Sequence, residues 1–152
     1  MKTSILFACL AGTAWGIGGF FEKSGLHALR IPPIVGIALR TAVALVILGL
    51  ISIPAWKGIA RTTDLRAWMM IIIGGGIVAG SLGMWSFYSA LAASPNLGIT
   101  LAVAFAFSPI AGTLMGLFRG TQKMDPKIGL GLAAIILGIV LIQLARPPAA
   151  PQ

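Results

Sequence analysis

Five long apolar runs dominate this sequence, and they determine the environment in which the chain can fold. They are Ile5–Phe21, Ile34–Ile53, Trp68–Leu91, Leu97–Phe118 and Ile128–Ala145. Each run approaches or exceeds the roughly 20 residues that a helix needs to cross about 30 Å of hydrocarbon. Membrane strands are excluded because the runs are about twice strand length and do not alternate. The sequence therefore predicts an all-α membrane protein, a bundle of five transmembrane helices.

The composition agrees with a lipid environment. Of 152 residues, 58% are hydrophobic and 9% are charged, whereas a soluble domain is about half apolar and about a quarter charged. The net charge of +8 would indicate a nucleic-acid partner in a soluble protein. Here the basic residues lie between the apolar runs, so they indicate membrane topology, and nucleic acid is not an expected partner.

Prolines and polar residues separate the runs. The adjacent Pro32 and Pro33 are predicted to start the second helix, and Pro54 is predicted to stop it. The segment Ser94–Asn96 predicts a tight turn between the third and fourth helices. Asp125, which precedes the fifth run, is the predicted N-cap of the last helix.

No linker divides the chain, so we expect one domain over residues 1–146 and a disordered tail over residues 147–152. The chain also lacks the side chains that most enzymes and metal sites need. Its carboxylates, with its single cysteine and single histidine, are Glu22, Asp64, Asp125, Cys9 and His27. They form no catalytic or metal-ligating arrangement, so we expect no enzyme activity, no cofactor and no metal.

Two helices carry hydroxyl and aromatic side chains where a lipid-facing surface would be aliphatic. At about 100° per residue, these side chains form one stripe on the third helix and one on the fourth. They are Ser81, Trp85 and Tyr88 on the third helix, and Thr100, Phe107 and Ser108 on the fourth. We expect both stripes to line a cavity, although Trp85 and Tyr88 also fit an interfacial aromatic belt.

Pro109 lies in the middle of the fourth run, where it cannot donate a backbone hydrogen bond. It predicts a kink, which is either a hinge beside a binding site or a feature of the architecture alone. Small residues also recur every three or four positions, as at Ala8, Gly12 and Gly16 in the first run. Such rows predict close helix packing within the chain, or a dimer face.

Arg40 is the one charge inside a run. It lies about 9 Å below the predicted membrane boundary, at 1.5 Å per residue, and a central arginine costs about 2.5–3.5 kcal/mol on insertion scales. Its side chain either snorkels to the interface or faces the bundle and holds an anionic group or backbone carbonyls. Glu22 follows the first run, and we expect it to end the first helix and to form a solvated ion pair with Lys23.

Together these residues resemble the EamA-like half-domain of the drug/metabolite transporter superfamily. The shared features, in chain order, are Trp15 with Gly16, Pro32 with Pro33, Arg40, Tyr88–Leu91, Pro109, and Gly129 with Gly138. The resemblance runs from about Ile5 to Gln143. One departure is that the family usually has Gly-Glu after the fourth helix, whereas Thr121 follows Gly120 here.

The resemblance implies one half of an inverted-repeat transporter. Members commonly carry two five-helix halves in opposite orientations, with the substrate path between them, and this chain supplies one. Its implied partners are the lipid bilayer, a small metabolite or drug-like solute, and a second copy or a related, oppositely oriented half. The expected substrate-binding residues are Trp15 and Arg40 together with the six stripe residues, and Pro109 is the expected hinge. The alternative is a non-transporting membrane scaffold or a lipid-binding subunit.

The basic residues predict the orientation, in what we expect to be a bacterial cytoplasmic (inner) membrane. Seven lie on the side of the N-terminus and three on the other side. The seven are Lys2, Lys57, Arg61, Arg66, Arg119, Lys123 and Lys127, and the three are Lys23, Arg30 and Arg146. The positive-inside rule then places the N-terminus in the cytoplasm and the C-terminus outside.

A reporter fused to the C-terminus tests this topology. A reporter that works only outside the cytoplasm should be active there, and one that works only in the cytoplasm should be inactive, because five crossings put the two ends on opposite sides. A C-terminus that supports only the cytoplasmic reporter would show that either the number of helices or the orientation is wrong.

Overall fold

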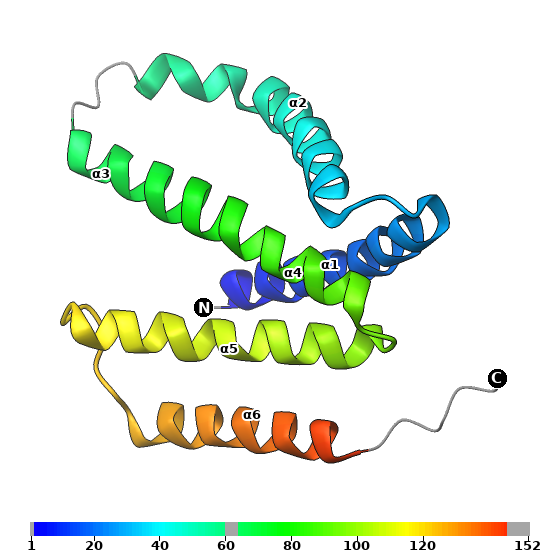
Figure 1. The fold of residues 1–152 in the computed structure, drawn as a ribbon. Helices are drawn as coiled ribbons and strands as arrows, with labels where there is room; N and C mark the ends of the chain where they lie inside the picture. Colours follow the sequence, from blue (N-terminus) through cyan, green and yellow to red (C-terminus); the bar gives the residue numbers. More distant parts are fainter. Residues whose placement is uncertain (1, 60–63, 146–152) are drawn as a thin grey trace. The chain divides into compact units, whose positions relative to one another are not determined.

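The computed structural model describes residues 2–59 and 64–145, which form helices joined by short connections (Figure 1). In this part of the chain five helices are long and apolar enough to cross a membrane. They are Thr3–Leu29, Pro33–Ile59, Leu65–Ala93, Leu97–Phe118 and Pro126–Leu144. The predicted all-α membrane architecture is therefore confirmed. The predicted tail, residues 147–152, lies outside the described residues.

The chain divides into two compact units, and the first is Met1–Pro95. It contains α1 (Lys2–Leu29) and α2 (Pro33–Ile59). Its third long helix changes geometry twice along its length. It consists of the α-helical α3 (Leu65–Met69), the π-helical η1 (Met70–Gly83) and the α-helical α4 (Met84–Ala93).

The second unit, Asn96–Gln152, contains α5 (Leu97–Phe118) and α6 (Pro126–Leu144), which contact each other. Side-chain caps start both helices. Asn96 Oδ1 accepts a hydrogen bond from the backbone N–H of Ile99 at 3.2 Å, and Asp125 Oδ1 accepts one from that of Lys127 at 2.7 Å. The N-cap predicted at Asp125 is confirmed, as is the turn before α5.

The end predicted for the first helix is wrong. α1 does not stop at Glu22 but continues to Leu29, and Arg30 then adopts a left-handed conformation with φ of 52°. The charged residues within the continued helix have partners in the protein. Glu22 pairs with Arg40, and Lys23 donates to the carbonyl of Ser94.

The end predicted for the second helix is also wrong, because α2 passes through Pro54 and continues to Ile59. Two side-chain hydrogen bonds lie across this turn. Ser52 Oγ donates to the Gly49 carbonyl at 2.9 Å, and Trp56 Nε1 donates to Ser52 Oγ at 2.9 Å. Neither bond reaches the carbonyl of Leu50, which is the one that loses its i−4 donor at Pro54. Membrane helices tolerate proline within a span, so Pro54 by itself does not end α2.

The π-helical segment η1 alters the side-chain directions of the third helix. It is rich in glycine, and a Cβ at Gly80 would lie only 3.0 Å from the Gly75 carbonyl oxygen. A π-helix turns through a smaller angle per residue than an α-helix, since its bonds join residues five apart. The side-chain hydroxyl of Ser81 also reaches five residues back and donates to the Gly76 carbonyl at 3.1 Å. The α-helical spacing assumed for the stripe of Ser81, Trp85 and Tyr88 therefore does not hold at Ser81.

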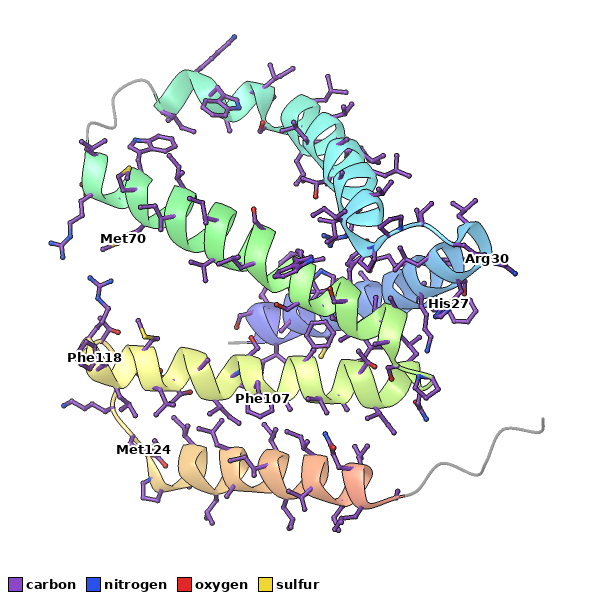
Figure 2. The ribbon with its side chains drawn as sticks, viewed as in Figure 1. His27, Arg30, Met70, Phe107, Phe118 and Met124 are labelled. Atoms are coloured by element: carbon purple, nitrogen blue, oxygen red, sulfur yellow. The ribbon has the colours of Figure 1, made fainter. Side chains whose placement is uncertain are left out.

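The core of the first unit lies where α1, α2 and α4 meet. Leu26, Ile37 and Tyr88 are buried there, and Ile31, Met84 and Phe87 pack against them. α4 contacts both α1 and α2, whereas α2 and η1 do not contact each other within the described residues. Most other large apolar side chains are exposed (Figure 2), as expected for a chain whose solvent is lipid.

Gly36 of α2 marks the closest approach in this core. A Cβ at this position would lie 2.8 Å from Leu26 Cδ2 and 3.1 Å from Tyr88 Cε1. At Gly12 and Gly16, which belong to a predicted packing row, an added Cβ would meet nothing within 4 Å. The small-residue spacing therefore does not identify the glycine at which helices pack most closely.

Substitution of Gly36 by leucine should destabilise the first unit. The larger side chain would displace Leu26 and the Tyr88 ring, and overpacking of this kind costs about 1–3 kcal/mol. Gly49→Leu is the matched control, since an added Cβ at Gly49 on the same helix meets nothing within 4 Å. Thermal unfolding in lipid nanodiscs should show a lower midpoint for Gly36→Leu only. An equal loss in both variants would contradict this packing.

Candidate functional site

A groove of about 360 Å³ lies beside the core of the first unit. Its lining comes from α1, α2, the connection between them, and α4. The lining residues are Phe21, Glu22, Gly25, Leu26, Leu29, Ile31, Gly36, Leu39, Arg40, Val43 and Tyr88. This volume is near the lower end of the roughly 300–1,000 Å³ typical of small-molecule sites. The lining is largely apolar, with polar groups at Glu22, Arg40 and Tyr88.

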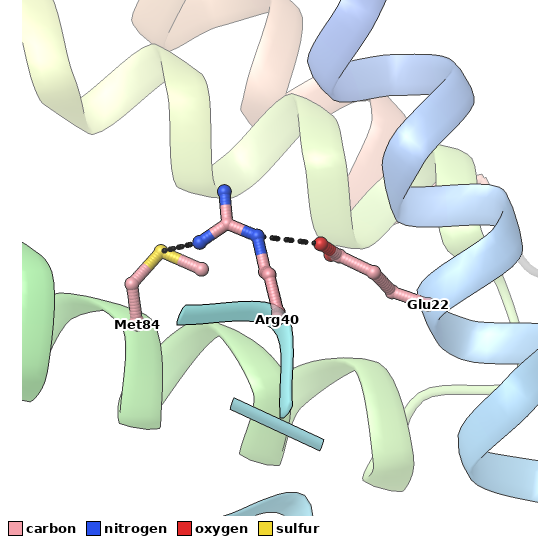
Figure 3. A network of polar contacts seen from close by, with 3 residues as sticks. All are labelled: Glu22, Arg40 and Met84. Atoms are coloured by element: carbon pink, nitrogen blue, oxygen red, sulfur yellow. Dashed lines mark hydrogen bonds and ion pairs between the residues drawn. The ribbon is translucent and has the colours of Figure 1, made fainter. Parts of the chain in front are cut away.

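An ion pair joins α1 to α2 in this groove. Arg40 Nε lies 2.8 Å from Glu22 Oε1, and Arg40 Nη1 donates to Met84 Sδ of α4 at 3.6 Å (Figure 3). The Glu22 side chain is 20% exposed and that of Arg40 is 37% exposed. Two opposite charges in contact avoid the cost of an unpaired charge in an apolar setting. Of the two alternatives for Arg40, the structure shows the one in which it faces the other helices, and Glu22 is its anionic group.

Tyr88 completes the polar part of the groove. Its side chain is 2% exposed, and its hydroxyl lies close enough to the Glu22 carboxylate to interact with it. The ring packs edge-on against Phe87, with 6.3 Å between ring centroids. A buried ring with this contact belongs to the core, so the interfacial belt does not describe Tyr88.

The predicted solvated pair of Glu22 with Lys23 is wrong. Adjacent residues of a helix point about 100° apart, and the two side chains have different partners. Lys23 Nζ donates to the Ser94 carbonyl at 2.6 Å, at the end of α4, where a cation also complements the helix dipole. The sequence did contain a signal for Glu22. It lies four residues before the buried Leu26, so continued helical periodicity places both on one face.

Three predicted site residues of the first unit lie outside the groove lining. Trp15 is 55% exposed and Trp85 is 54% exposed. Ser81 is exposed and bonded to its own helix. Among the predicted residues of this unit, the structure therefore brings together Arg40 and Tyr88 only.

The remaining predicted residues lie on α5 in the second unit. Thr100 is buried and donates to the Asn96 carbonyl at 3.1 Å. Phe107 and Ser108 are exposed, and Figure 2 shows Phe107 pointing from α5 toward α6. The helix continues past Pro109 to Phe118. That these residues line a substrate path stays a prediction.

Within the described ranges, no group of three or more His, Cys, Asp or Glu side chains is placed to hold a metal ion. A guanidinium, a carboxylate and a phenol lie on a surface formed otherwise by aliphatic groups and Phe21. Such a surface can hold the apolar body of a small molecule and orient its polar end.

Comparison with known proteins adds a family to this description. The model of the EamA-like transporter family matches residues 2–144. No curated protein and no solved structure gives a significant match. The match covers nearly the whole chain and includes all five helices that are long and apolar enough to cross a membrane. The chain therefore belongs to the EamA-like transporter family.

Proposed function

We propose that the chain is a half-size membrane transporter subunit that moves a small metabolite or drug-like solute, and that the groove of the first unit belongs to the solute path. The observation that carries this proposal is the ion pair of Arg40 and Glu22 in an otherwise apolar groove. Charged groups within membrane helices are costly, and they commonly mark substrate pathways.

The exposure of Arg40 supports a role beyond holding helices together. Its side chain is 37% exposed, although its guanidinium contacts both Glu22 and Met84. These contacts use Nε and Nη1, and Nη2 takes part in neither. A guanidinium presents its donors in a planar fork, so this end of Arg40 can bind an acceptor on a solute. Glu22 and Tyr88 then position the guanidinium.

We further propose that the working unit contains a second half, because five helices leave little room for an enclosed alternating-access path. An antiparallel pair of identical chains would require some copies to insert the other way round. The bias of basic residues opposes an even split of orientations. A related, oppositely oriented chain is therefore favoured over an antiparallel pair of copies, and a parallel pair comes third.

Variants of the ion pair test the transport proposal. Arg40→Leu should abolish transport and Arg40→Lys should reduce it, because lysine keeps the charge but loses the planar fork. Arg40→Leu also leaves Glu22 without its partner, which costs about 3–5 kcal/mol for a fully buried pair and less at this partly exposed one. The double variant Glu22→Gln with Arg40→Leu should recover stability but not transport.

Membrane vesicles from cells producing each variant, loaded with a defined metabolite mixture, provide the measurement. Solute release is followed by mass spectrometry, and thermal unfolding of the same samples reports stability. Lys57→Gln is the control, since it removes a positive charge from α2 outside the groove lining. A double variant that transports as well as the natural chain would contradict a solute-binding role for Arg40.

Crosslinking in native membranes, followed by mass determination, tests the second half. We expect a product heavier than the single chain of 15.7 kDa. A mass of twice this value indicates two copies and a higher multiple indicates more copies. A mass that is not a multiple of it indicates a different partner. A single-chain species alone, with transport intact, would contradict all of the proposed pairings.

A further inference from the structure

We infer that Glu22 sets the charge selectivity of the groove. By neutralising Arg40 it makes the groove a site for small solutes that carry a hydrogen-bond acceptor and no net charge, and it excludes monovalent anions. The inference deepens the proposed function and rests on the groove being the place where the solute binds.

Different nitrogen atoms of Arg40 are available for contacts within the protein and for a bound solute. Nε contacts Glu22 Oε1 at 2.8 Å, and Nη1 contacts Met84 Sδ at 3.6 Å (Figure 3). A solute acceptor can therefore bind at Nη2 while the ion pair remains intact. Glu22 need not be displaced, so the carboxylate keeps its charge and its partner when the site is occupied.

The charge balance then decides which acceptor binds well. Glu22 and Arg40 are the charged residues of the groove lining, and they come from α1 and α2. α4 contributes the neutral Tyr88, whose hydroxyl also lies near Glu22. Lys23, the basic neighbour of Glu22, contacts the Ser94 carbonyl instead. An anion bound to Arg40 would therefore be repelled by the Glu22 carboxylate, because the lining holds no second cation. This repulsion is poorly screened in an apolar setting.

A neutral acceptor avoids this repulsion. An amide or carbonyl oxygen gains a charge-assisted hydrogen bond from the guanidinium without adding a charge to the groove. The remaining lining is apolar, with side chains such as Phe21, Leu39 and Val43, and the cavity is about 360 Å³. The fitting solute is therefore small, with an apolar body and one neutral polar end.

Two probes of nearly equal shape test this inference. Phenylacetamide and phenylacetate share an aromatic body and differ in the charge of the acceptor group. Their affinities for the full chain in lipid nanodiscs follow from ligand-dependent shifts in thermal unfolding. The natural chain should bind the amide at least about tenfold more tightly than the anion, which corresponds to about 1.4 kcal/mol of binding free energy.

Glu22→Gln should reverse this preference, because it keeps a side chain of similar size that can hydrogen-bond but leaves Arg40 without a counter-charge. The control is Asp64→Asn. It removes one negative charge outside the groove lining, and asparagine can replace aspartate as the N-cap of α3. This control should keep the preference of the natural chain.

Three results would overturn the inference: equal affinities of the natural chain for the two probes, no gain in anion affinity with Glu22→Gln, or no binding of either probe. The first and third do not depend on any variant folding. Because binding is measured rather than transport, the outcome is separate from that of the vesicle experiment. If Glu22→Gln reverses the preference but the natural chain transports nothing in vesicles, the proposed function is refuted and the charge selectivity of the groove still holds.

Discussion

Hydrocarbon supplies no hydrogen-bond partners, and this constraint governs every polar group in the transmembrane helices. Helices satisfy the backbone, and hydroxyl side chains bond back to their own helix. Thr13 donates to the Cys9 carbonyl, Ser24 to that of Phe20, and Ser86 to that of Leu82. These residues therefore cost little where they stand and need no cavity. A hydroxyl in a membrane helix is weak evidence for a binding site by itself, as Ser81 also shows.

Charged side chains are less easily satisfied within one helix turn, and here they have partners on neighbouring helices. Glu22 and Arg40 join α1 to α2, and Lys23 joins α1 to the end of α4. Gly36 allows Leu26 and Tyr88 to pack closely beside the ion pair. The groove lies at this junction, where residues of three helices and both members of the ion pair line it.

Much of the architecture could be predicted from the sequence because it depends on local properties. Run length and hydropathy predicted five helices, and the turn at Ser94–Asn96 and the cap at Asp125 follow from residue type. The predicted ends at Glu22 and Pro54 failed for a common reason. Both assumed that a charge or a proline ends a membrane helix. In the structure Glu22 lies within α1 and pairs with Arg40, and α2 passes through Pro54 to Ile59.

The sequence by itself determined the membrane environment, the number of long apolar runs and the presence of one charge within a run, because transfer free energy and helix length are sums over neighbouring residues. Only the tertiary structure decided which carboxylate pairs with Arg40, which glycine admits a close contact, and that Tyr88 but not Trp85 or Ser81 shares the groove with Arg40. Those outcomes depend on how each helix is rotated about its axis, on how closely neighbouring helices approach each other, and on the π-helical geometry of η1. A pairing between residues 22 and 40 becomes visible only when two helices are placed side by side.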